Sequence, residues 1–136
     1  MKLSKIRYDV DKAEGGAWVD VPGTHFAGVS LKVRSRGTVE YRRRQRQLEA
    51  GVARRIGTML DPEDEDRIDA TLLHELVLLD WAGLEEDDGT AIPYSPERAK
   101  ALLFDPCLAA FRSIVRLAAD MQNERGRADL AADVGN

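Results

Sequence analysis

Apolar residues alternate with polar ones at residues 6–10 and 29–33 in the first third of the chain, and a mainly apolar run at residues 17–21 lies between them. A period of two is typical of strands that bury one face. Turn-forming residues separate the runs, with glycines at residues 15–16 and Pro-Gly at residues 22–23. The pattern therefore predicts three short antiparallel strands.

A basic helix is predicted to follow, over residues 38–60. Thr38 is a suitable N-cap, because its hydroxyl can accept a hydrogen bond from an N–H group of the first turn. Gly51 weakens the second half of this helix by about 1 kcal/mol relative to alanine. We therefore expect a break near Gly51.

Three later helices are predicted from the same start signal, a capping residue followed by proline. A proline suits the first helical position, because its φ angle is fixed and its missing N–H is not needed there. The three starts are Asp61-Pro62, Ser95-Pro96 and Asp105-Pro106. From the apolar spacing we expect the first helix to end near residues 81–83 and the last near Gly126.

Strands first and helices afterwards predict an α+β fold, with a small N-terminal antiparallel β-sheet followed by about four α-helices. The 136 residues suit one domain. We place this domain at residues 1–126, β-rich over 5–34 and helical over 38–125, followed by a flexible C-terminal tail at 127–136. Residues predicted to form the structural core are Trp81, Leu72, Leu76, Phe111 and Val115.

The net charge of −4 hides an asymmetry between the two parts of the chain. Residues 1–60 carry 13 Lys and Arg against 6 Asp and Glu, a net of +7, whereas residues 61–136 carry 7 against 18, a net of −11. Charges divided in this way can steer partners, pair between subunits or form two solvated surfaces, and the sequence leaves these alternatives open. The single cysteine, Cys107, excludes an intrachain disulfide and indicates a reducing compartment.

No motif indicates a catalytic or metal site. His74 begins a helix segment like that of zinc proteases, but Leu78 stands where the second histidine belongs. The acidic loop at residues 86–89 favours a hairpin-like turn rather than an EF-hand, whose first and last ligand positions would hold Leu84 and Ser95. We assign no catalytic, cofactor-binding or metal residues and expect a protein that is not an enzyme.

Two groups of residues are candidates for binding a partner. The arginines of the basic helix can neutralise phosphates of a nucleic acid or dock an acidic partner. The pI near 5.2 and the scarcity of aromatic residues nearby make nucleic acid the less favoured partner. Aromatic side chains beside prolines at helix junctions form the second group. The candidate residues are Arg42, Arg43, Arg44, Arg46, Leu84, Tyr94 and Phe104.

One block of the chain resembles a known family. Its residues are Asp80-Trp81-Ala82-Gly83-Leu84, Asp88-Gly89, Ile92-Pro93-Tyr94-Ser95 and Asp105-Pro106. Together with the N-terminal strands and the arginine-rich helix, this order is similar to that of tail assembly chaperones of long-tailed (siphovirus-type) phages. The resemblance covers residues 6–122.

The resemblance implies a non-enzymatic chaperone of phage or prophage tail morphogenesis. Such a protein binds and solubilises the tape measure protein and helps recruit tail tube protein subunits, without a cofactor. It would act in the host (bacterial) cytoplasm and be absent from the mature virion. The alternatives are a structural tail or neck protein retained in the virion and a small DNA-binding regulator; self-association is left open.

Overall fold

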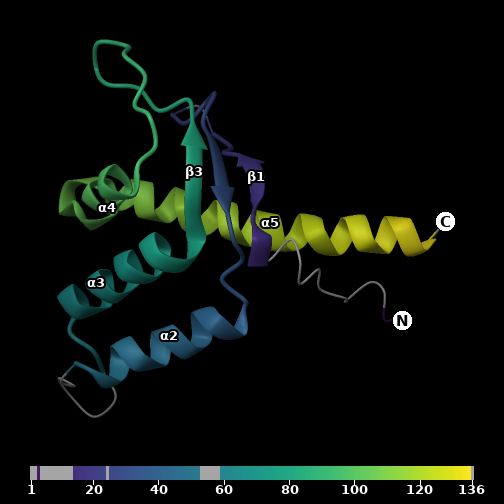
Figure 1. Ribbon diagram of the computed structural model, residues 1–136, viewed down its shortest axis with the longest axis horizontal. Helices are drawn as coiled ribbons and strands as arrows, with labels where there is room; N and C mark the ends of the chain where they lie inside the picture. Colours follow the sequence, from purple (N-terminus) through teal and green to yellow (C-terminus); the bar gives the residue numbers. More distant parts are fainter. Residues whose placement is uncertain (1–2, 4–13, 24, 53–58, 136) are drawn as a thin grey trace.

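The computed structural model describes residues 3, 14–23, 25–52 and 59–135, with side chains described up to residue 122. Within these residues it confirms an α+β fold, in which a three-stranded antiparallel sheet is combined with four α-helices (Figure 1). The elements are β1 (Ala17–Asp20), β2 (Ser30–Val33), α2 (Val39–Ala50), α3 (Pro62–Leu72), η2 (Leu73–Val77), β3 (Leu78–Ala82), α4 (Pro96–Phe104), η3 (Pro106–Leu108) and α5 (Ala109–Gly135).

Two of the three predicted strands form as expected. The runs at residues 17–21 and 29–33 become β1 and β2, which pair antiparallel. Val19 lies opposite Leu31 and both are buried, whereas Trp18, 48% exposed, lies opposite Lys32 on the other face. The run at residues 6–10 lies outside the described residues.

The third strand of the sheet comes from a segment that the sequence pattern assigned to a helix. The helix that begins at Asp61 was expected to reach residues 81–83; instead α3 ends at Leu72 and widens into one π-helical turn, η2. The chain then extends as β3 along the open edge of β2. The predicted helical segment, residues 38–125, therefore contains a strand.

A β-bulge explains why the spacing of apolar residues in this strand predicts a helix. Leu78 and Trp81 are both buried although they are three residues apart, a spacing that normally indicates a helix. In the structure, the pairing register shifts between Lys32 and Val33, so Val33 lies opposite Leu78 and Leu31 lies opposite Trp81. The extra residue in β3 brings both side chains to the core face.

The helix starts follow the predicted capping residues, except that Asp105 caps the short 3-10 helix η3 and the last α-helix, α5, begins only at Ala109. Side-chain oxygens of Thr38, Asp61, Ser95 and Asp105 each accept a hydrogen bond of 2.9–3.1 Å from a backbone N–H of the turn that follows. These bonds satisfy donors that have no partner within the helix. The break expected near Gly51 is also present, because α2 ends at Ala50.

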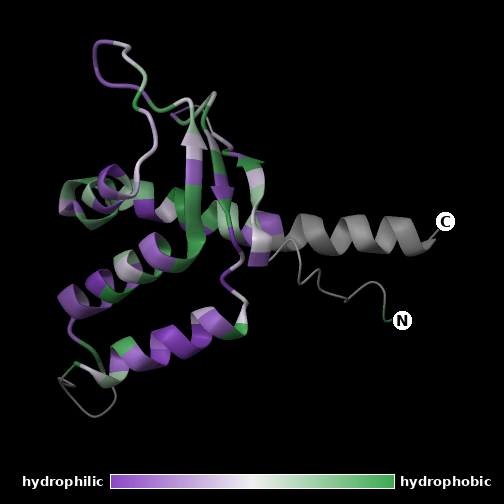
Figure 2. Cartoon of the chain, in the orientation of Figure 1, coloured by the Kyte–Doolittle hydropathy of each residue, from purple (hydrophilic) through white to green (hydrophobic). Residues whose placement is uncertain are grey.

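The core lies between the sheet and the helices. Helix α5 crosses the sheet and packs against β1 and β2, while α2 packs on the far side of α3 (Figure 1). Four of the residues predicted for the core are buried; Leu76 is only partly buried and packs against the core from η2. Figure 2 shows that α2 is almost entirely hydrophilic, whereas apolar stretches line β2 and β3.

The end of the chain differs from the expectation. Helix α5 continues to Gly135, so the predicted end near Gly126 is wrong and the backbone of residues 127–135 is helical rather than irregular. Alanine and leucine, the best helix formers, are frequent over residues 128–132. A single glycine costs only about 1 kcal/mol within a helix, so it does not have to end one.

Candidate partner-binding surfaces

Helix α2 presents a basic surface to solvent. Arg42, Arg43 and Arg46 are exposed, and together with Val39, which is 59% exposed, they line a shallow depression of about 620 Å³. We call these four residues the arginine face. Within the described part of the chain, none of its three guanidinium groups has an ion-pair partner.

The fourth predicted arginine has a different role. Arg44 donates from Nε and Nη2 to the two carboxylate oxygens of Glu75 on η2, at 2.9 and 3.2 Å. This hydrogen bonding and the charge of Glu75 raise the pKa of Arg44. The pair fixes α2 against η2, so Arg44 positions the arginine face and is not part of it.

Tyr94 lies at the border of the core. Its ring packs edge-on against Trp81 with centroids 5.0 Å apart, and Trp81 packs in the same way against Phe111 at 6.2 Å. The indole N–H of Trp81 donates to the carbonyl of Ile92 at 2.7 Å, which holds the chain segment that carries Tyr94. Burial, with added repulsion from nearby carboxylates, raises the pKa of Tyr94. Tyr94 therefore belongs mainly to the structural cluster.

Leu84 lies elsewhere, in a depression of about 380 Å³ between the loop at residues 25–29 and the end of β3. Beyond it, the acidic loop forms the expected hairpin-like turn, closed by the Glu85–Ala91 bridge. The Asp88 carboxylate accepts a hydrogen bond from the N–H of Thr90 at 2.9 Å. Hydrogen bonding to Thr90 lowers the pKa of Asp88.

Phe104 lies at a third place, at the end of α4. Its side chain is 37% exposed and lines a separate pocket of about 380 Å³ beside α3. Helix α2, which carries the arginine face, and the loop after β3 lie on opposite sides of the molecule (Figure 1). The structure therefore does not bring Leu84, Tyr94 and Phe104 together into one surface.

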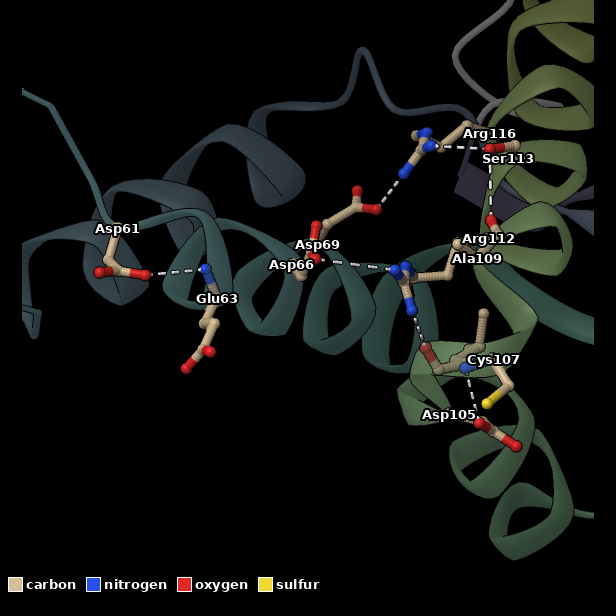
Figure 3. A network of polar contacts seen from close by, with 11 residues as sticks. Asp61, Glu63, Asp66, Asp69, Asp105, Cys107, Ala109, Arg112, Ser113 and Arg116 are labelled. Atoms are coloured by element: carbon tan, nitrogen blue, oxygen red, sulfur yellow. Dashed lines mark hydrogen bonds and ion pairs between the residues drawn. The ribbon is translucent and has the colours of Figure 1, made fainter.

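Sequence reasoning missed a polar network between α3 and α5 (Figure 3). Arg116 pairs with Asp69, and Arg112 reaches from α5 toward Asp66, with Nη2 and the carboxylate 3.9 Å apart. The only signal in the sequence is spacing, since the two acids and the two arginines each lie one helical turn apart. That spacing places each pair on one helix face but does not say which faces meet.

His74, which begins the segment like that of zinc proteases, has a structural role. His74 Nε2 donates to the carbonyl of Pro96 at 3.0 Å and so joins η2 to the start of α4. Among the described residues, no group of three His, Cys, Asp or Glu side chains is arranged to hold a metal ion. In that same part of the chain, no helix is long and apolar enough to cross a membrane.

Comparison with known proteins gives a family match. The family model described as YdaY prophage protein matches residues 34–136, which is more than half of the chain. The matched segment begins directly after β2 and includes α2, α3, β3, α4 and α5. No curated protein and no solved structure matches the chain.

Proposed function

On the premise that this chain belongs to the YdaY prophage protein family, we propose that it is a non-enzymatic tail assembly chaperone that binds and solubilises the tape measure protein. It helps recruit tail tube subunits, acts in the host cytoplasm and leaves before the particle is complete. Family membership supports the phage origin. The resemblance of residues 80–106 to tail assembly chaperones supports the finer assignment.

The observation that carries the proposal is the arginine face. Arg42, Arg43 and Arg46 are charged and solvated on a helix whose start is capped and whose side is fixed by the Arg44–Glu75 pair. A rigid row of guanidinium groups suits an acidic segment of a partner, because Arg binds carboxylates in a forked geometry. Charge complementarity of this kind mainly increases the encounter rate and fixes the register.

Exposed apolar groups supply the second part of the mechanism. Phe104 and Val39 remain at the surface, and Leu84 is only partly buried. Covering an apolar face of a long helical partner removes that face from water, at about 25 cal/mol per Å² of apolar area. The chaperone action is therefore non-covalent masking, which needs no cofactor.

The test is co-expression with the tape measure protein of the same prophage. We expect the soluble yield of the tape measure protein to rise and the two proteins to elute together. Equal solubility with and without this chain, and no common elution peak, would exclude the chaperone function. Mass spectrometry of mature particles separates the alternative, because a structural tail or neck protein remains in the particle.

Charge reversal tests the arginine face directly. In the triple variant Arg42→Glu, Arg43→Glu and Arg46→Glu, we expect slower association with the tape measure protein and an unchanged melting temperature, because Arg44 still holds α2 in place. The association rate of the original chain should fall as salt rises, and that of the variant should not.

A salt-dependent gel shift with duplex DNA serves as the control. Strong DNA binding that the triple charge reversal abolishes would favour the DNA-binding regulator instead.

A further inference from the structure

The pocket beside Phe104 has features that the proposed function does not yet use. It lies between α3 and the corner where α4 turns through η3 into α5. Asp66 and Ala70 of α3, Phe104 and Pro106 of the corner, and Arg112 of α5 line it. We call it the corner pocket. It shares no lining residue with the arginine face or with the depression around Leu84.

One wall of the corner pocket is apolar. Phe104 is 37% exposed, with Lys100 Nζ 5.9 Å from the centroid of its ring, and Pro106 beside it is exposed as well. Large aromatic side chains are usually well buried, and leaving their surface in water is unfavourable. The volume of about 380 Å³ is enough to hold at least one large side chain of a partner.

A buried guanidinium group forms the inner end of the pocket. The Arg112 side chain is only 8% exposed, and its Nη1 donates to the carbonyl of Leu103 at 3.1 Å. The Asp66 carboxylate, 3.9 Å from Nη2, is too far away for a hydrogen bond (Figure 3). Among the described residues, Leu103 is thus its one acceptor in range, so N–H donors remain for an acceptor that enters the pocket.

The rim of the corner pocket on α3 is acidic. Glu63 is exposed and Asp66 is 72% exposed. Arg67 also lines the pocket, but its charge is paired with Asp64 on the same helix. An apolar wall, an acidic rim and a buried donor define the chemistry of the occupant. They match an amphipathic helix with one large apolar side chain, a Lys or Arg about one turn away, and a carbonyl or amide oxygen that reaches Arg112.

We propose that the corner pocket docks a basic amphipathic helix of the protein's partner, with one large apolar side chain seated against Phe104 and Pro106. This inference rests on the proposed function and names where the tape measure protein is held. The charge of the rim selects the occupant, because acidic Glu63 and Asp66 attract a basic helix and repel an acidic one.

The experiment measures the dissociation constant of the tape measure protein for the full chain and for two pairs of variants. Phe104→Ser removes the apolar wall; its control, Leu117→Ser, removes a side chain on α5 that is 44% exposed and lies outside the pocket. Glu63→Lys reverses the rim; its control, Glu97→Lys, makes the same change at the matching position after proline in α4.

Phe104→Ser and Glu63→Lys should each raise the dissociation constant by about tenfold or more, with unchanged melting temperatures, and the two controls should leave it unchanged. If the unmodified chain does not bind the tape measure protein, the proposed function itself fails. If it binds and Phe104→Ser binds as tightly as Leu117→Ser, only the corner pocket is wrong. Self-association that Phe104→Ser abolishes, with partner binding intact, would show that a second copy occupies the pocket and overturn the inference.

Discussion

At the scale of single residues, Trp81 contacts several separate elements of the structure, which the sequence pattern does not indicate. It lies in β3 opposite Leu31, and its ring packs against Phe111 of α5. Its indole N–H donates to the Ile92 carbonyl in the loop, and Tyr94 packs on its edge. One side chain therefore joins the sheet, the last helix and the loop after β3.

Trp81→Ala should lower the free energy of unfolding by about 3–5 kcal/mol, because it leaves a large cavity in the core and removes the donor to the Ile92 carbonyl. Chemical denaturation measures the change. Trp81→Phe is the matched control; it keeps an aromatic ring and should cost less. An unchanged midpoint for Trp81→Ala would contradict the core position.

The partly buried phenol of Tyr94 makes the free energy of unfolding depend on pH in the alkaline range. Burial raises its pKa above the usual value of about 10, so the folded state holds this proton to a higher pH than the unfolded state does. The stability that Tyr94 contributes is therefore complete below the unfolded pKa and declines as pH rises through the folded pKa.

Tyr94→Phe has no such proton to lose. Relative to the original chain, the variant should gain stability as pH rises from about 9 to about 11. Urea denaturation across this range measures the difference, and a difference that stays constant with pH would refute the assignment.

At the scale of elements, the change from α3 through η2 to β3 determines the fold. The π-helical turn ends the helix early, and the strand that follows completes the sheet. Directly after β3, Gly83 adopts a φ of +87° and lies against the backbone of Gly28. This close approach joins the loop before β2 to the end of β3.

Gly83→Ala should be strongly destabilising. A Cβ at this position would lie 2.0 Å from the Gly28 carbonyl oxygen, in addition to the strain of a positive φ. Gly89→Ala is the matched control, because Gly89 has a φ of +88° but open space around it. The control should lose only the strain energy, about 1–2 kcal/mol, and Gly83→Ala should lose more. Thermal denaturation of both variants tests this, and equal losses would contradict the close approach.

At the scale of the whole molecule, the basic and acidic parts of the chain meet. Arg44 of the basic part pairs with Glu75 of the acidic part, and Arg36 lies 3.7 Å from Asp120. The charge asymmetry is thus partly neutralised inside the fold. The arginine face and the acidic rim of the corner pocket are two charged surfaces that stay exposed.

Removing residues 127–136 should change the melting temperature little. Among the described side chains, the buried ones of α5 lie between Phe111 and Gln122, before the cut. A truncation that starts at Ala118 is the contrast, because it deletes buried alanines and should lower the melting temperature clearly. A large loss from the shorter truncation would show that the end of α5 docks.

The sequence by itself determined the features that depend on neighbouring residues. Thr38, Asp61, Ser95 and Asp105 specify helix starts because a capping bond spans only two or three residues. The apolar residues at 17–21, set between two turns, and the alternation at residues 29–33 specify strands for the same reason. The strand predicted at residues 6–10 lies outside the described residues.

Only the tertiary structure decided how these elements meet. Residues 78–82 carry a spacing that fits either a helix or a bulged strand, and the open edge of β2 selects the strand. The arginines at 42–46 look equivalent along the chain, but Glu75 of a distant element takes Arg44. The corner pocket likewise depends on Arg112 meeting α3. Long-range contacts of this kind leave no local signal, because the free energy that selects them arises only when separate segments pack together.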